Sequence, residues 1–185
     1  RALITVLVLS IAAGVVGLFI SFRDLEFVTD GLVHAVFPGL VVGYIVGGSA
    51  MLLPGALVAG IIAAVLLVFF AGRDSLGHDA AIVVVLTSMF SLGIVLVSRQ
   101  EGYVSQLESL LFGHLLTVTD VQLVSVAIVS LAACLIIAYT WRAQLFRASD
   151  ETGFRAAGFS TVRTDIWLNI AVAMLVVAGV QALGN

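Results

Sequence analysis

The feature that most restricts how this chain can fold is a series of apolar segments, each close to twenty residues long and free of charged side chains. The hydrocarbon core of a bilayer is crossed by a helix of roughly 20 apolar residues. The first segment, residues 2–22, ends directly before the charged pair Arg23 and Asp24. Because these segments are continuously apolar rather than alternating, they predict membrane-spanning helices and not the strands of a sheet.

The composition agrees with this interpretation. The 185 residues are 62% hydrophobic and 10% charged, whereas soluble domains are about 45–50% apolar and about 25% charged. A soluble fold and a disordered chain are both excluded. All eight basic residues are arginines against 11 acidic residues, which gives a net charge of −3 and no support for nucleic-acid binding. The single cysteine, Cys134, can form no internal disulfide.

Six apolar spans are predicted, with a turn between the second and the third at Gly47–Ser49 and Pro54. We therefore predict an all-α integral membrane protein, a polytopic helical bundle of about six transmembrane helices. We expect residues 1–185 to form one membrane domain, and because the chain does not begin with methionine we treat it as incomplete at both ends. The predicted spans are residues 2–22, 27–46, 51–71, 79–97, 121–139 and 165–183.

Two connections are long enough to carry structure of their own. Residues 106–113 form a mixed polar and apolar stretch that predicts a short interfacial or re-entrant helix, and residues 141–163 predict a short amphipathic helix at the membrane surface. Six of the eight arginines follow the first, third and fifth spans, while Arg1 and Arg99 lie on the other side. Because arginines concentrate in cytoplasmic loops, this distribution places the 142–163 loop in the cytoplasm and the N-terminus outside.

The second span carries the candidate chemistry. Asp30 and His34 are four residues apart and therefore share one helix face, and ionisable residues inside a membrane are functional by default. Pro38 continues the same face, lacks an N–H, and should kink the helix and leave the His34 carbonyl without its donor. Carboxylate, imidazole and carbonyl ligands suit a divalent first-row metal better than magnesium or calcium. In the alternative interpretation, Asp30 caps a later-starting helix and His34 is hydrogen-bonded in the core.

A second stripe of small residues runs along this span at four-residue spacing. Small residues at this spacing let another helix backbone approach closely. We therefore expect one flank of the helix to pack tightly and the adjacent flank to present Asp30 and His34 to a protein interior or cavity. The stripe consists of Gly31, Ala35, Gly39, Gly43 and Gly47.

These motifs carry a resemblance to a known family. Residues 30–39 read DGLVHAVFPG and resemble the Asp-x-x-x-His-Ala-x-x-Pro-Gly signature of metal-ion ABC importer permeases, the zinc/manganese/iron family. Residues 78–82, HDAAI, are similar to an acidic-Asp-Thr-Ala-Ile segment, with His78 and Ala80 as departures. Residues 150–158 resemble the cytoplasmic Asp-Pro-Glu-Phe-Ala-x-x-x-Gly stretch without its proline. Weaker matches follow in the family's order at residues 92–96, 110–113 and 181–184.

The resemblance implies a permease subunit of the bacterial cytoplasmic membrane that works as a homodimer, docks a cytoplasmic ATP-binding subunit and receives metal from an extracellular or periplasmic metal-binding protein. Asp30 and His34 match the positions that line the family's metal pathway. Residues 143–158 match the helix that couples to the ATPase. Candidate pathway or gate residues are Pro38, Glu108 and His114, and the candidate coupling residues are Asp150, Glu151, Phe154, Arg155 and Gly158.

The leading functional hypothesis is a binding-protein-dependent permease for manganese, zinc or ferrous iron that works by alternating access. The chain has no G-x-x-x-x-G-K-[ST] loop, so we expect it not to be an enzyme, with ATP hydrolysis in a partner. We expect no permanently bound cofactor, only the transported ion, manganese or zinc first. The alternative is an ATP-independent secondary transporter or channel, but no second Asp-x-x-x-His copy marks an inverted repeat. An intramembrane hydrolase would need His-Glu-x-x-His or Gly-x-Ser-x-Gly, which the sequence lacks.

Overall fold

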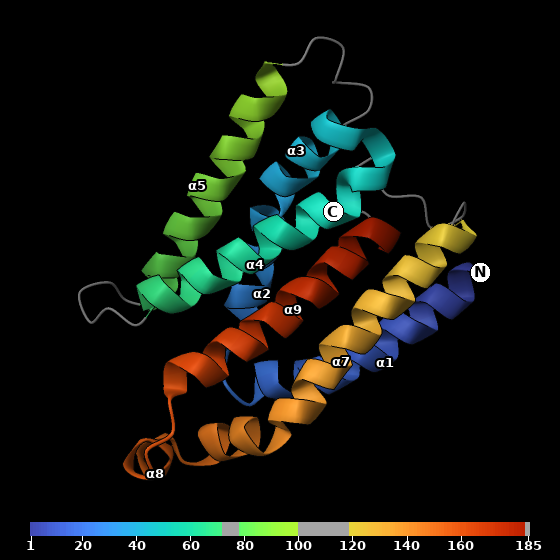
Figure 1. Ribbon diagram of the computed structural model, residues 1–185. Coiled ribbons are helices and arrows are strands. Elements are labelled where there is room, and N and C mark those ends of the chain that lie inside the picture. The colour runs from blue at the N-terminus through green and yellow to red at the C-terminus, as the bar shows by residue number, and fades with distance from the viewer. Residues whose placement is uncertain (72–77, 100–118, 184–185) are drawn as a thin grey trace.

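The computed structural model describes residues 1–71, 78–99 and 119–183, and every regular element in these ranges is helical. Figure 1 shows the helices packed as a bundle. The elements in chain order are α1 (Ala2–Ser21), α2 (Glu26–Ala35), α3 (Phe37–Gly47), the 3-10 helix η1 (Gly48–Met51), α4 (Leu52–Ala71), α5 (His78–Ser98), α7 (Asp120–Ser149), α8 (Glu151–Ala156) and α9 (Thr161–Leu183).

Among the described residues, five helical stretches are long and apolar enough to cross a membrane. One of them, Glu26–Phe70, contains 45 residues and folds back on itself at Gly48, whose φ of +62° lies in the left-handed region that glycine adopts readily. It therefore provides two passes, α2–α3 and α4, and the predicted polytopic helical bundle is confirmed. The predicted turn between the second and third spans is also present, while Pro54 lies in the first turn of α4, where its missing N–H is tolerated.

The helices form two neighbouring groups. In Figure 1, α1, α7 and α9 lie side by side, and α4 packs between α9 and the pair formed by α3 and α5. Buried apolar residues from all of the long helices join the two groups into one core, which includes Phe19 of α1, Leu32 of α2, Leu67 of α4, Ile82 of α5 and Leu168 of α9. The α2 helix is thus held on its buried side, against α5, α9 and α4.

Polar residues at the helix starts explain where α7 and α8 begin. Thr119 forms a capping box with Gln122: the Thr119 hydroxyl accepts from the Gln122 backbone N–H at 3.3 Å, and the Gln122 side chain accepts from the Thr119 N–H at 3.0 Å. Asp150 caps α8 by accepting from the Gly153 N–H at 2.8 Å. Gly158, at φ +82°, ends the turn after α8 in a conformation that favours glycine.

The fifth span is longer than predicted. The α7 helix continues through Ser149, so the prediction that residues 141–163 leave the span as a separate surface helix is wrong for residues 141–149. Buried contacts explain the extension, because Gln144 is fully buried and Arg147 is largely buried against α9. The predicted short helix at residues 106–113 lies outside the described residues.

The described arginines separate between the two ends of the bundle. Arg23, Arg147 and Arg155 lie at the end that carries α8, where Arg23 meets α7 and α9. Arg1 lies at the opposite end and pairs with Asp120 at 2.8 Å. The ends of the bundle at which these four arginines lie therefore follow the alternation of the spans along the sequence.

Candidate functional site

The helix that carries Asp30 and His34 is interrupted at Val36. Pro38 has no N–H to donate to the His34 carbonyl four residues earlier, and the next two donors, the N–H groups of Gly39 and Leu40, both bond to the Val36 carbonyl at 3.0 and 3.2 Å. The α2 helix ends at Ala35 and α3 begins at Phe37. The span is therefore broken two residues beyond His34, close to the middle of the 26–47 segment.

Asp30 and His34 differ in their surroundings. Asp30 is exposed on the surface of the chain, whereas His34 is half-buried and makes an edge-to-face contact with Phe90 of α5, with ring centroids 5.7 Å apart and an interplanar angle of 77°. Phe90 also contacts Phe37, at 5.5 Å. This aromatic contact restricts the imidazole from one side and leaves the Asp30 side of the helix open.

The expectation that Asp30 faces a protein interior is not met within the described part of one chain. Among the described residues, no group of three or more His, Cys, Asp or Glu side chains is close enough to hold a metal ion. Asp30 and His34 together supply two donors, and transition metals in proteins take four to six. Within one chain the described residues thus provide an incomplete coordination sphere that opens to the surface. His114 and Glu108 lie outside the described residues.

The small-residue stripe lies where helices approach most closely. A Cβ atom on Gly39 would overlap the Gly55 carbonyl oxygen, and one on Gly43 would overlap the Met51 carbonyl oxygen. On the preceding helix, a Cβ on Gly31 would lie 2.8 Å from the Ile82 side chain of α5. The backbones of α3 and α4 are therefore in direct contact, and the broken helix is fixed between α4 and α5.

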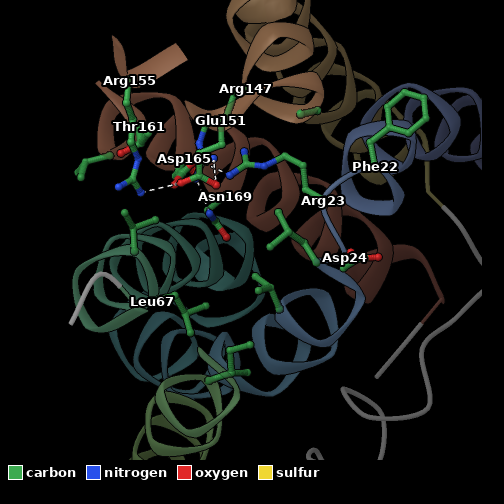
Figure 2. Close-up of a pocket in the computed structure, with 16 residues that line it drawn as sticks. Phe22, Arg23, Asp24, Leu67, Arg147, Glu151, Arg155, Thr161, Asp165 and Asn169 are labelled. Atoms are coloured by element: carbon green, nitrogen blue, oxygen red, sulfur yellow. Dashed lines mark hydrogen bonds and ion pairs between the residues drawn. The ribbon is translucent and has the colours of Figure 1, made fainter. Parts of the chain in front are cut away.

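A cluster of charged and polar side chains lies at the end of the bundle that carries α8 (Figure 2). Asp165, near the start of α9, accepts hydrogen bonds from Arg23, which follows α1, and from Arg147 of α7, the latter at 3.5 Å. Arg147 also pairs with Glu151 of α8 at 2.5 Å. Gln144 is fully buried, accepts from Arg23 at 3.2 Å and donates to the Thr164 carbonyl at 2.9 Å.

The four charged residues of this cluster, Arg23, Arg147, Glu151 and Asp165, line a cavity of about 620 Å³ that opens between the α8 end of the bundle and the start of α2. The Arg147 guanidinium holds the pKa of the Glu151 carboxyl below its usual range, chiefly by donating a hydrogen bond to it. Sequence reasoning missed this cluster as a unit. Its signal was the presence of Arg23 and Asp165 at the ends of two predicted spans, whereas Arg147 lies eight residues beyond the predicted span 121–139 and nothing in the sequence marks the burial of Gln144.

The candidate coupling residues lie on and beside α8 and divide into two kinds. Phe154 is 1% exposed and makes an edge-to-face contact with Phe146 of α7 at 5.4 Å, so it anchors α8 to the bundle and does not face a partner. Glu151 and Arg155 are exposed and pair with each other at 2.6 Å. Asp150 caps the helix. Both charged residues of α8 thus face outwards.

The whole chain matches one protein-family model. Residues 1–185 match the ABC 3 transport family. The chain belongs to this family. The predicted resemblance to metal-ion ABC importer permeases is thereby confirmed, and it rests on the full described bundle and not on the second-span motif alone.

Several curated relatives of this family member are named as membrane proteins of metal transport systems. The manganese transport system membrane protein MntC of Halalkalibacterium halodurans is 30% identical over 184 residues, covering 100% of this chain and 62% of that protein. The manganese import system permease protein ScaB of Streptococcus gordonii is 29% identical, and a probable iron transport system membrane protein of Haemophilus influenzae is 27% identical. The chain spans about three-fifths to two-thirds of the length of these relatives.

A solved structure shares the fold. The chain is similar to a chain of PsaBC from Streptococcus pneumoniae, solved in complex with Fab, with a TM-score of 0.81 and 30% identity over 100% of this chain and 65% of that one. The order and packing of the described helices are therefore similar to those of that chain.

Proposed function

We propose that this chain is part of the permease subunit of a binding-protein-dependent ABC importer for divalent transition-metal ions, manganese or ferrous iron before zinc. The observation that carries the proposal is the match of the whole chain to the ABC 3 transport family together with an Asp–His pair beside a helix break in the second span. The printed names of its relatives, which are manganese and iron transport membrane proteins, support the choice of cargo. The protein would be multi-pass in the bacterial inner membrane, with α8 in the cytoplasm.

The ion would bind to the Asp30 carboxylate and the His34 imidazole. The exposure of Asp30 supports a shared site, because the missing ligands must come from outside the described part of this chain. A second copy of the permease is the partner that we propose, which makes the active unit a homodimer. Helix α2 packs closely on α5, where a Cβ on Gly31 would lie 2.8 Å from the Ile82 side chain, so the Asp–His pair would sit on a fixed helix rather than on a loop.

Energy would come from a separate ATP-binding subunit that docks on α8, and the ion would arrive from an external metal-binding protein. The charged outward residues Glu151 and Arg155 and the buried anchor Phe154 support α8 as the docking element, since a docking helix must be fixed to the bundle and open to a partner. The transport cycle would be alternating access, in which movement of α8 changes the packing around α2.

The cellular metal content of a strain that depends on this permease tests the proposal. Wild type, Asp30→Asn and His34→Ala are grown with a chelator, and manganese, zinc and ferrous iron are resupplied one at a time before mass spectrometry. Glu26→Gln is the matched control, because Glu26 is an exposed acid one turn earlier on the same helix. Membrane levels of each variant are measured by immunoblot.

Wild type and Glu26→Gln should accumulate manganese or iron, and the two site variants should lose accumulation of the same ion at unchanged protein levels. Unchanged accumulation in both site variants would show that the Asp–His pair is structural. Accumulation that persists when the partner ATPase is inactivated would instead favour a gradient-driven transporter.

A further inference from the structure

The α8 helix is connected to the start of α2 by a continuous chain of ion pairs. Glu151 is the first residue of α8 and pairs with Arg147 at 2.5 Å. Arg147 bonds to Asp165 at 3.5 Å, and Asp165 also pairs with Arg23. The series of ion pairs therefore runs from α8 through α7 and α9 to the connection between α1 and α2.

These ion pairs are shielded from water where they cross between helices. The side chains of Arg23 and Arg147 are 10% and 12% exposed, and that of Asp165 is 21% exposed. Charged hydrogen bonds in such surroundings are stronger than those at an open surface and keep a defined geometry. The fully buried Gln144 adds a neutral bridge between Arg23 and the backbone of α9. The four charged side chains balance to zero, so the cluster does not form an anion site.

The connection from Arg23 to α2 is short and rigid. Four residues separate α1 from α2, and the N–H groups of Arg23 and Leu25 both bond to the Ile20 carbonyl, at 3.2 and 3.0 Å. Leu25 is buried, and Val28 donates back to its carbonyl at 3.1 Å. A displacement of the Arg23 backbone, drawn by its ion-paired side chain, would therefore be passed to the first turn of α2, which is the turn before Asp30.

The cavity lies beside this path. It occupies about 620 Å³ and is bounded by Arg147 and Asp165 on one side and by Leu25 and Val28 of the α1–α2 connection and α2 on the other. Side chains do not fill this space, so they do not pack across it between the α8 end of the bundle and the start of α2. The ion pairs beside the cavity are therefore the direct link between these two parts.

We propose that Arg23, Arg147, Glu151 and Asp165 act as positioning residues that transmit displacement of α8 to the start of α2 and so to the Asp30–His34 pair. This inference rests on the proposed function, because it assigns a role within the transport cycle. Coupling between distant sites is carried by rigid elements and by connected polar networks with more than one arrangement. Breaking the ion pairs should separate ATP hydrolysis from metal movement while leaving both sites formed.

The test uses the intact importer, purified through a tag on this permease and reconstituted in proteoliposomes. Uptake of Mn²⁺ and hydrolysis of ATP are measured together for wild type, Asp165→Asn and Arg147→Gln. The matched control is Asp120→Asn, which breaks an Arg–Asp pair at the other end of the bundle, where Arg1 and Asp120 are 61% and 72% exposed. Asp165→Glu keeps the charge and should partly restore coupling.

We expect Mn²⁺ taken up per ATP hydrolysed to fall about tenfold or more in Asp165→Asn and Arg147→Gln, within the range of allosteric coupling energies, and to stay unchanged in Asp120→Asn. The ATPase rate and the amount of assembled complex should stay near those of wild type. An unchanged ratio in both variants would overturn the inference. Uptake and hydrolysis that fall in equal proportion would also overturn it, because a purely structural role predicts that result.

A second measurement separates this inference from the proposed function. Nitroxide labels on Phe27→Cys of α2 and Ala157→Cys after α8, both exposed positions, are introduced with Cys134→Ala, and complexes with one labelled copy are studied. The distance distribution should stay narrow on ATP binding in the wild-type background and broaden or shift with Asp165→Asn. A wild-type importer that moves no Mn²⁺ would refute the proposed function, whereas identical distributions in the two backgrounds would refute the relay.

Discussion

Replacing Gly39 by alanine should separate α3 from α4. A Cβ at this position would overlap the Gly55 carbonyl oxygen and lie 2.5 Å from the Ala59 Cβ and 2.8 Å from the Gly55 carbonyl carbon. Carbon atoms pack at about 3.5–4.0 Å, so the two helices must move apart by about 1 Å. The obstacle is backbone on α4, which cannot turn aside as a flexible side chain can.

The change in the free energy of unfolding follows from two destabilising contributions and one stabilising contribution. Overpacking of this kind costs about 1–3 kcal/mol, and a gap of about 0.5–1 Å forfeits a quarter to a half of the dispersion energy of each contact along the seam. Alanine in place of glycine in a helix returns about 0.5–1 kcal/mol. The net destabilisation should be about 1–2 kcal/mol, which lowers the unfolding midpoint by roughly 2–8 °C in a protein of this size.

The assay is thermal unfolding of the full-length permease in detergent, followed by tryptophan fluorescence. Gly14→Ala is the matched control, because Gly14 is exposed on α1 and a Cβ there would meet nothing within 4 Å. This control should be neutral or slightly stabilising. A Gly39→Ala midpoint equal to that of Gly14→Ala would refute the close approach of α3 and α4.

Three further changes test local features by the same assay. Asp24 adopts φ +51°, so Asp24→Gly should raise the midpoint and Asp24→Val lower it, each by the equivalent of about 1 kcal/mol; equal midpoints would contradict that backbone conformation. Gln144→Leu removes the donor to the Thr164 carbonyl and should cost about 1–3 kcal/mol, and a neutral result would show that the bond is absent. Because Arg147 lowers the pKa of Glu151, the stabilising pair is present above pH of about 4.3 and is lost as pH falls through the lowered pKa. The difference in unfolding free energy between wild type and Glu151→Gln should be under about 1 kcal/mol and should disappear on acidification. A difference that grows on acidification would contradict the lowered pKa of Glu151.

The membrane spans were predictable because crossing a bilayer depends on length and hydropathy, which are local properties. The turn at Gly48 was predictable for the same reason, since consecutive glycines between two apolar segments interrupt a helix. The extension of α7 through Ser149 was not, because it depends on burial of Gln144 against residues far away in the sequence.

The candidate site was predictable in part. The four-residue spacing places Asp30 and His34 on the same side of α2, and the helix break follows from Pro38. The exposure of Asp30 and the contact between His34 and Phe90 depend on which helices pack beside α2, and periodicity carries no information on that. Likewise, two charged span ends and an arginine in a predicted connection do not reveal that Arg23, Arg147 and Asp165 meet.

Direct Mn²⁺ binding to the full-length permease in nanodiscs tests the central claim most closely. Each protein is titrated with Mn²⁺, and electron paramagnetic resonance measures the loss of the free Mn²⁺ signal. The proteins are wild type, Asp30→Asn, His34→Ala and the control Glu26→Gln. Loss of an outer-shell partner weakens metal sites by about 10–100-fold, so loss of a ligand should weaken binding at least as much in the two site variants. Wild type and Glu26→Gln should bind equally well. Equal binding by all four proteins would contradict the assignment of Asp30 and His34 as the metal site.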